Sequence, residues 1–254
     1  MKKKVLVVWK NQGQTPLEVI EHVKKALPDL QNEKISYAGR LDPMAEGLLL
    51  LLLGDENKKR KEYEGLKKVY ETEVVFGITT DSYDGLGLVK KVSSKCAPSQ
   101  NDMEGELEDL IGKRDQQYPP YSSKPVGGKP LYWWARNNKL SEIKIPKKEI
   151  EIYSARLLSF KTMDGKDLLG EILKRIDLVK GNFRQDEISK HWKESLSKGS
   201  FLVARIGISC SSGTYVRGIA HDLGQDFGCG AFALTIRRIA IGEFGEKDCL
   251  PLLP

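Results

Sequence analysis

Six leucines in a row at residues 48–53 limit the fold of this chain more than any other feature of its sequence. Gly47 and Gly54 bound the run, which is as long as one strand and far too short to cross a bilayer. Side chains of a strand point alternately to opposite faces, so leucine at every position predicts a central strand that is covered on both faces. A buried helical turn is the alternative, because leucine is a weaker strand former than the β-branched residues.

The composition is that of a globular protein with a sizeable core. At 254 residues, with 30% charged and 40% apolar residues, the chain shows neither the pattern of a disordered protein nor that of a membrane span. Three lysines at residues 2–4 precede a short apolar run, as in a signal peptide, but the run ends at Lys10 and no cleavage site follows. We therefore expect a first strand here, in a cytoplasmic protein without a membrane anchor.

The net charge of +6 is compatible with a polyanionic partner. Basic residues cluster at residues 58–61, 67–68, 90–91 and 237–238, although each cluster alone is more typical of a solvated face than of a phosphate-binding track. The cysteines, which are Cys96, Cys210, Cys229 and Cys249, are far apart and lack C-x-x-C spacing. This spacing predicts neither a zinc site nor a disulfide framework, so four free thiols and no metal are expected.

Strand and helix patterns follow one another along the whole chain. Thr15, Pro16 and Glu18 form a helix start signal with a capping box, and Leu17, Ile20, Val23 and Leu27 then recur at helical spacing as the predicted core face. Alternating apolar residues predict strands at residues 69–78, 149–160, 201–209 and 231–241, with a helix at residues 214–227.

This order of elements favours an α+β fold in one domain over residues 1–254, because no linker divides the chain. Residues 165–199 carry two amphipathic helical patterns joined near Gly181, between two predicted strands. We expect them to form a helical insertion that packs on the main body.

Asp42 is a charged residue at the entrance to the leucine run, and it has two interpretations. Followed by Pro43, it fits the N-cap of a helix with proline at the first helical position. Alternatively, a turn supported by Gly39 holds its carboxylate beside the strand as a positioned nucleophile, ionised at neutral pH unless burial shifts its pKa. The two roles do not exclude each other.

Arg217 lies in the first turn of the predicted helix at residues 214–227, where the helix dipole disfavours a cation. A surface arginine that extends into water is one explanation. The other is an anionic partner nearby, and an ion pair with a catalytic carboxylate would account for both Asp42 and Arg217.

Aromatic and basic residues occur together in two further segments. Tyr70 follows Lys67 and Lys68, so its ring could stack on an unpaired base while the lysines meet phosphates, although a tyrosine in a strand is more often core. The segment YSSKPVGGKPLYWWAR, which contains Lys124, Lys129 and Arg136, has the mixture typical of an RNA-contacting loop. Its two tryptophans are equally natural helix anchors.

Seven blocks of the sequence, in order, resemble the TruB family of tRNA pseudouridine synthases. They are VWKNQGQTP, AGRLDPMAEGLL with LGDENK, KKVYETEVVFG, TTDSYDG, YPPYSSKPVGGKPLYWWAR, SSGTYVRGIAHDLG with GCGA, and TIRRIAIGEF. The resemblance implies a pseudouridine synthase domain with a central mixed, largely antiparallel sheet flanked by helices and loops. It also implies a cofactor-free isomerisation of a T-loop uridine, position 55 in the usual tRNA count, in the T arm of tRNA.

The resemblance assigns roles to particular residues. Asp42 matches the catalytic aspartate, Tyr70 the tyrosine that stacks on the flipped base and is implicated in proton removal from C5, and Arg217 the arginine that pairs with the carboxylate. Asp84 and Ile236 match further positions around the base. The C-terminal PUA domain of many bacterial members is expected to be missing, since about ten residues follow Phe244. The resemblance also implies a monomer.

Some residues depart from the family pattern. Tyr37 replaces the usual histidine, Arg40 the usual small residue, Glu46 the usual threonine or serine, and Asn11 the common proline. Arg40 is thereby left to contact the RNA backbone or the surroundings of the flipped nucleotide, with Tyr37 altering how the T loop is opened.

Two rival functions remain at the level of sequence. The Arg40-Leu41-Asp42 triplet is a hallmark of RsuA-type and RluA-type pseudouridine synthases, but their R-x-H-Q-I-R-like block is missing and GTYVRGIAHDLG stands in its place. A non-catalytic tRNA-binding or tRNA-folding module is the other rival, although such a module would not need a carboxylate that faces a polyanion.

Overall fold

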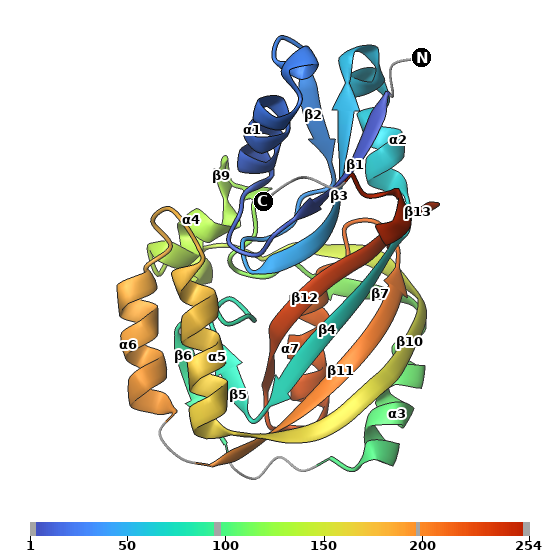
Figure 1. Ribbon diagram of the computed structural model, residues 1–254. Helices are drawn as coiled ribbons and strands as arrows, with labels where there is room; N and C mark the ends of the chain where they lie inside the picture. The colour runs from blue at the N-terminus through green and yellow to red at the C-terminus, as the bar shows by residue number, and fades with distance from the viewer. Residues whose placement is uncertain (1–3, 94–97, 197–198, 251–254) are drawn as a thin grey trace.

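The computed structural model describes residues 4–93, 98–196 and 199–250, and its centre is a mixed sheet (Figure 1). Within these residues nine strands join the sheet, and seven of them form one path from edge to edge. In spatial order the path is β1 (Val5–Lys10), β3 (Ala45–Leu53), β12 (Ala231–Ile241), β4 (Lys68–Phe76), β11 (Ser200–Cys210), β10 (Lys147–Asp164) and β7 (Gly112–Gln117).

The pairing in this sheet is largely antiparallel, as the family resemblance implies. The exception is β3 against β12, which run parallel with Ala45 opposite Ile236. Two short strands extend the sheet, since β2 (Ile35–Ala38) pairs with β3 and β13 (Phe244–Gly245) pairs with β12. Separate hairpins are formed by β5 (Ile78–Thr80) with β6 (Val89–Val92), and by β8 (Pro125–Val126) with β9 (Lys129–Pro130).

Helices flank the sheet, so the α+β class is confirmed. They are α1 (Pro16–Ala26), α2 (Arg60–Gly65), α3 (Gln100–Asp109), α4 (Leu131–Arg136), α5 (Gly165–Asp177), α6 (Gln185–Ser195) and α7 (Val216–Asp226). None of the helices in the described ranges is both long and apolar enough to span a membrane.

The leucine run forms strand β3, and both of its faces are covered as expected. Leu49 and Leu51 pack with Val19 and Val23 of α1. On the other face, Leu48, Leu50 and Leu52 pack with residues that include Val7 and Ile241. Each of the five leucines at residues 48–52 has no exposed surface, which stabilises the fold by about 2 kcal/mol apiece. The strand is therefore a rigid support for the turn that precedes it.

The remaining strands separate two further layers of core. One face of β4 and β11 contributes Val74 and Ile206 to a cluster with residues of α3 and α7. The opposite face contributes Val75 and Val203 to a cluster with α5 and α6. In Figure 1, α7 accordingly lies behind the sheet, while α5 and α6 stand side by side at the left. In the chain these two helices come between β10 and β11. These two helices occupy the segment predicted to be helical; its status as an insertion in a single domain stays a prediction.

Two local predictions need correction. The capping box of α1 is present, but the predicted core face is shifted, since Leu17 is 63% exposed and Val19 is buried in its place. The expectation of four free thiols is also wrong, because Cys229 is disulfide-bonded. Cys210 and Cys249 are free, and Cys96 lies outside the described residues.

Candidate active site

Asp42 is presented by the turn between β2 and β3. Gly39 begins this turn with φ +79°, a conformation that favours glycine, and the Ala45 amide donates to the Asp42 carbonyl at 3.0 Å. The chain then enters β3 directly, so the predicted role of Asp42 as a helix N-cap is wrong. The carboxylate is 32% exposed and is held beside the buried strand, as the alternative interpretation predicted.

Arg217 reaches Asp42 from the first turn of α7, as the sequence suggested. Its Nε donates to Oδ2 of Asp42 at 2.8 Å, its Nη1 to the Ser82 carbonyl at 2.7 Å and its Nη2 to the Tyr121 carbonyl at 3.1 Å. Every nitrogen of the guanidinium thus has a partner, and the planar group is fixed in orientation. The carboxylate it holds is aimed by a group that cannot rotate away.

The electrostatic balance at Arg217 explains why the pair is stable although it is buried. Burial alone lowers the pKa of Arg217, but the carboxylates of Asp42 and Asp84 outweigh that effect, and the pKa lies above its ordinary value. The guanidinium is 2% exposed, so removing the Asp42 carboxylate would deprive a buried cation of its hydrogen-bonded anion. The pair is therefore a fixed part of the site.

Asp84 is a second carboxylate near Arg217, with Oδ2 4.0 Å from the arginine Nε. Its Oδ1 accepts from the Ser82 hydroxyl at 2.5 Å and from the Leu86 amide at 3.0 Å. Burial raises the pKa of Asp84 from 3.8 to about 6, against the opposing effect of Arg217. Asp42 and Asp84 both line the cleft, but the side chain of Asp42 is 32% exposed and that of Asp84 only 8%.

Tyr70 lies on β4 opposite Arg238 of β12, and its ring is 8% exposed. Burial raises the pKa of the Tyr70 phenol, and the nearby Arg238 opposes this rise without cancelling it. The phenol is therefore protonated at neutral pH. Ile236, on the same strand as Arg238, lines the same cavity as Tyr70 and Asp42.

A cleft contains Asp42 where its two lobes meet. The residues that line both lobes are Arg40, Leu41, Asp42, Ser123 and Arg217. The first, which we call the sheet lobe, has a volume of about 600 Å³. Its other walls include Lys68, Tyr70, Tyr118, Lys124, Lys148, Tyr215, Ile236 and Arg238. The second lobe is lined in part by the connection between α5 and α6, and we call it the hairpin lobe after this helical hairpin. It has a volume of about 460 Å³, and its walls include Leu17, Tyr37, Tyr121, Tyr132, Arg136, Phe183 and Arg184.

Most of the site residues predicted from sequence lie around these lobes. Arg40 is exposed and donates to the Ser123 hydroxyl at 2.7 Å and to the Tyr37 hydroxyl at 3.3 Å. Lys124 lines the sheet lobe and Arg136 the hairpin lobe. Lys129 lines neither lobe, since its Nζ lies 3.4 Å from the centre of the Trp133 ring.

Sequence reasoning missed the burial of three cations, which are Lys10, Lys68 and Arg238. Arg238, which was expected on a solvated face, is 1% exposed and donates to the carbonyls of Leu48 and Gly39 at 2.8 and 3.1 Å. Lys68 is 4% exposed, and burial lowers its pKa to about 8. Lys68 and Arg238 each follow a less buried basic residue, Lys67 or Arg237. Side chains alternate between the two faces of a strand, and this period of two was the signal that could have distinguished the buried cation of each pair from its neighbour.

The packing of β12 against β3 explains why residue 47 is a glycine. A Cβ there would lie 2.3 Å from the Arg238 carbonyl oxygen, so a side chain would push β12 away from β3. The close parallel pairing brings Arg238 within reach of the Asp42 turn. No group of three or more His, Cys, Asp or Glu side chains in the described ranges is arranged to hold a metal ion.

Comparison with known proteins places this site in a family. Residues 25–183, more than half of the chain, match the family described as "TruB family pseudouridylate synthase (N terminal domain)". The chain belongs to the TruB family. A TruB-family relative named tRNA pseudouridine synthase B, from Nitratidesulfovibrio vulgaris, is 32% identical over 246 residues, which cover 96% of this chain and 65% of the relative. Another of the same name, from Solibacter usitatus, is 31% identical over 240 residues, covering 94% and 67%.

The chain spans about two thirds of the length of these TruB-family relatives. Among solved structures, a Cbf5-Nop10-Gar1 complex contains a chain that matches with a TM-score of 0.59 at 17% identity, covering 95% of this chain and 50% of the other. A chain of an H/ACA RNP bound to a substrate RNA containing 2'-deoxyuridine matches with a TM-score of 0.55 at 16% identity, covering 95% and 48%. At this identity the two structures establish a shared fold.

Proposed function

We propose that this chain is a tRNA pseudouridine synthase that converts a T-loop uridine, position 55, to pseudouridine without a cofactor. The observation that carries the proposal is the Asp42–Arg217 pair at the junction of the two lobes, with the carboxylate partly exposed and the arginine buried. Membership of the TruB family and the names of its relatives support the same reaction.

The chemistry needs an ionised, immobile carboxylate. Uridine's N1–C1′ bond breaks, the base turns, C5 bonds to C1′, and the C5 proton leaves while N1 gains a proton, so the product is an isomer. Asp42 either attacks the ribose or assists glycal formation, and both routes need an aimed anion. Arg217 supplies that aim through its bond to Oδ2.

The sheet lobe supports the handling of the base. A uridine must leave its stack before the carboxylate can reach it, and an aromatic wall compensates for the lost stacking. Tyr70 offers an aromatic ring and Ile236 an apolar side chain in the lobe that Asp42 also lines. Because its phenol is protonated, Tyr70 can accept the C5 proton only through a partner or after deprotonation, and Arg238 is the cation beside it that favours the phenolate.

The cations around the cleft suit an RNA backbone. Arg40, Lys124 and Arg136 lie at the two lobes, where each could contact a phosphate of the T arm. Lys129, on the β8–β9 hairpin, extends the same basic surface in this proposal. We further propose a monomer that works in the cytoplasm, with tRNA as its partner.

Incubation of the chain with an unmodified T-arm transcript, followed by carbodiimide-dependent primer extension, tests this function. Wild type should produce pseudouridine at the T-loop uridine, and Asp42→Asn should produce none while it keeps its fold by circular dichroism. Absence of product from wild type would refute the enzyme, and product from Asp42→Asn would refute the role of Asp42.

The rival functions give different results in the same assay. Product on an rRNA fragment but not on the T arm would assign an RsuA-type or RluA-type substrate. Binding of the T arm by wild type without any product would assign a non-catalytic binding or folding module. Asp42→Ala should bind the T arm as wild type does, with an affinity that falls as salt rises.

A further inference from the structure

The tip of the α5–α6 hairpin reaches the candidate active site from a separate part of the chain. Phe183 and Arg184 line the hairpin lobe, and the Asn182 carbonyl accepts from Nη2 of Arg136 at 3.0 Å. At the base of the tip, a Cβ on Gly13 would lie 2.1 Å from the Leu178 carbonyl oxygen, so the two backbones are in close contact. The hairpin is therefore fitted against the cleft.

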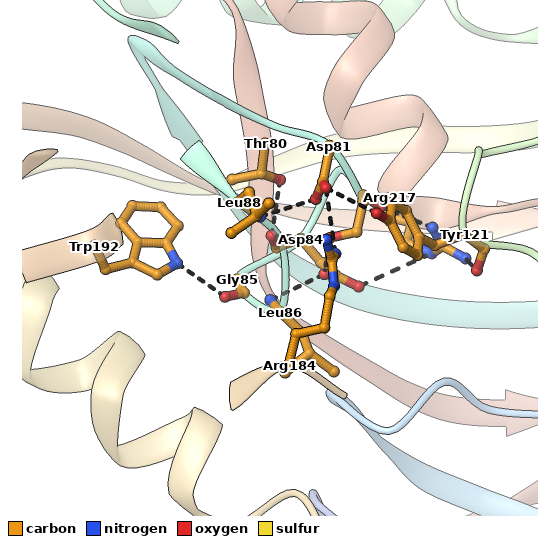
Figure 2. A network of polar contacts seen from close by, with 11 residues as sticks. Thr80, Asp81, Asp84, Gly85, Leu86, Leu88, Tyr121, Arg184, Trp192 and Arg217 are labelled. Carbon is orange, nitrogen blue, oxygen red and sulfur yellow. Dashed lines mark hydrogen bonds and ion pairs between the residues drawn. The ribbon is translucent and has the colours of Figure 1, made fainter. Parts of the chain in front are cut away.

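The Asp81 carboxylate binds Arg184 at the tip of this hairpin. Its Oδ1 accepts from the Leu88 amide at 2.8 Å, and its Oδ2 accepts from the Tyr121 hydroxyl at 2.9 Å and from Nη2 of Arg184 at 3.2 Å (Figure 2). The carboxylate is 13% exposed, and the Arg184 guanidinium also lies over the Tyr121 ring, 4.8 Å from its centre. A nearly enclosed carboxylate thus joins three segments of the chain.

Both carbonyls that hold Arg217 belong to residues beside this carboxylate. Ser82 follows Asp81 in the chain, and Tyr121 is bound to Asp81 through its hydroxyl. Movement of Asp81 would therefore shift the two acceptors of the arginine's Nη atoms together. The Asp42 carboxylate depends on the same guanidinium.

A second contact ties the hairpin to the same turn. Nε1 of Trp192, a fully buried residue of α6, donates to the Gly85 carbonyl at 3.1 Å, next to Asp84 (Figure 2). Trp192 fixes one end of the turn at residues 81–86, and Arg184 fixes the other.

The backbone at Arg184 indicates that this placement is specific. Arg184 has φ +65° and ψ +31°, a left-handed conformation that costs a residue other than glycine about 1 kcal/mol. It is also the N-cap of α6 without a side-chain cap bond, so its side chain does not stabilise the helix start. The contacts with Asp81 and Tyr121 are what this conformation makes possible.

We propose that Arg184 is a positioning residue, which acts through Asp81 on the Ser82 and Tyr121 carbonyls to orient Arg217 and, through it, Asp42. The part that concerns catalysis rests on the proposed function. The part that concerns the position of Arg217 stands without it.

The test compares Arg184→Gln with Arg184→Lys, and with Lys193→Gln as a matched control for an exposed cation on α6. Arg184→Gln should lower kcat on a T-arm transcript about tenfold with KM within about twofold, because geometry and not affinity is lost. Arg184→Lys should recover most of kcat, since it keeps a cation for Asp81, and Lys193→Gln should behave as wild type. A raised KM with unchanged kcat would overturn the proposal and make Arg184 a substrate contact.

A spectroscopic readout separates this proposal from the proposed function. The Nε–H signal of Arg217, assigned by its loss in Arg217→Lys, should exchange with solvent about tenfold faster in Arg184→Gln than in wild type. Unchanged exchange would overturn the proposal whether or not the protein makes pseudouridine. The double variant Asp81→Asn with Arg184→Gln should lose no more kcat than Asp81→Asn alone, and additive losses would also overturn the proposal.

Discussion

Arg217 and Asp42, 175 residues apart in the sequence, are joined by an Nε–Oδ2 hydrogen bond of 2.8 Å between a buried arginine and a partly exposed aspartate. The arginine side chain is 2% exposed and the carboxylate 32% exposed. One partner therefore anchors the pair in the protein, and the other presents an oriented anion to the cleft.

Replacement of the anchor should be costly to stability. Arg217→Met removes all three hydrogen bonds and leaves Asp42 and two carbonyls without their donor, so we expect the free energy of unfolding to fall by about 3–5 kcal/mol. Urea unfolding at neutral pH measures this loss. Arg237→Gln is the control, because its ion pair with Glu246 is on the surface and should contribute less than about 1 kcal/mol. Equal losses in the two variants would contradict the description of Arg217 as an anchor.

The enclosed carboxyl of Asp84 should make stability depend on pH. Burial raises its pKa from 3.8 to about 6, so the folded protein binds this proton more tightly than the unfolded chain. The resulting stabilisation is complete below the unfolded pKa and is lost as the pH rises through about 6. Asp84→Asn stays neutral and keeps an oxygen for the Ser82 and Leu86 donors. Relative to wild type, it should therefore gain about 2–3 kcal/mol between pH 4 and pH 7.5.

Urea unfolding of both proteins at the two pH values measures this difference. Other groups with raised pKa values, such as Asp222, are common to both proteins and cancel in the comparison. A stability difference that stays the same at pH 4 and pH 7.5 would show that Asp84 titrates normally.

Tyr70→Phe should separate the later chemistry from binding. The ring and its packing remain, so stability and affinity for the T arm should change little, while loss of the hydroxyl should slow proton removal from C5 by about 10²-fold or more. Release of tritium from a transcript labelled at uridine C5 measures that step. Tyr153→Phe, at an exposed site on β10, should release tritium at the wild-type rate. Wild-type release by Tyr70→Phe would exclude its hydroxyl from proton transfer.

Arg40 should contribute one phosphate contact to RNA binding. Its side chain is exposed at both lobes and is held in place by the Ser123 hydroxyl. In Arg40→Gln, the slope of log affinity against log salt should become less steep by about 0.7–0.9, as expected for one lost phosphate contact. Filter binding from low to physiological salt measures the slope. Lys113→Gln, on β7 and in the lining of neither lobe, should keep the wild-type slope. An unchanged slope in Arg40→Gln would assign Arg40 to a base or to the protein itself.

Features governed by neighbouring residues were predictable from the sequence. The capping box of α1 depends on Thr15 and Glu18 alone, and the burial of β3 follows from leucine on both faces. The partner of Arg217 was also foreseen, because a cation in the first turn of a helix calls for an anion.

Features governed by distant contacts were not predictable in this way. Arg238 is buried because β3 and the Asp42 turn supply carbonyl acceptors that lie about 190 residues earlier in the chain. Leu17 is exposed at the hairpin lobe although its helical spacing suggested core. The approach of Arg184 to Asp81 likewise depends on the packing of α5 and α6, which no local pattern encodes.

The parallel pairing of β3 with β12 has a consequence for the order of folding events. Ala45, three residues after Asp42, pairs with Ile236, and the carbonyls of the preceding turn bind Arg238. During synthesis, β1, β2 and most of β3 can associate early, but this last register must wait until residue 238 has left the ribosome. The nascent chain therefore assembles its scaffold first and completes the turn that presents Asp42 only when nearly all of the described sequence has been made.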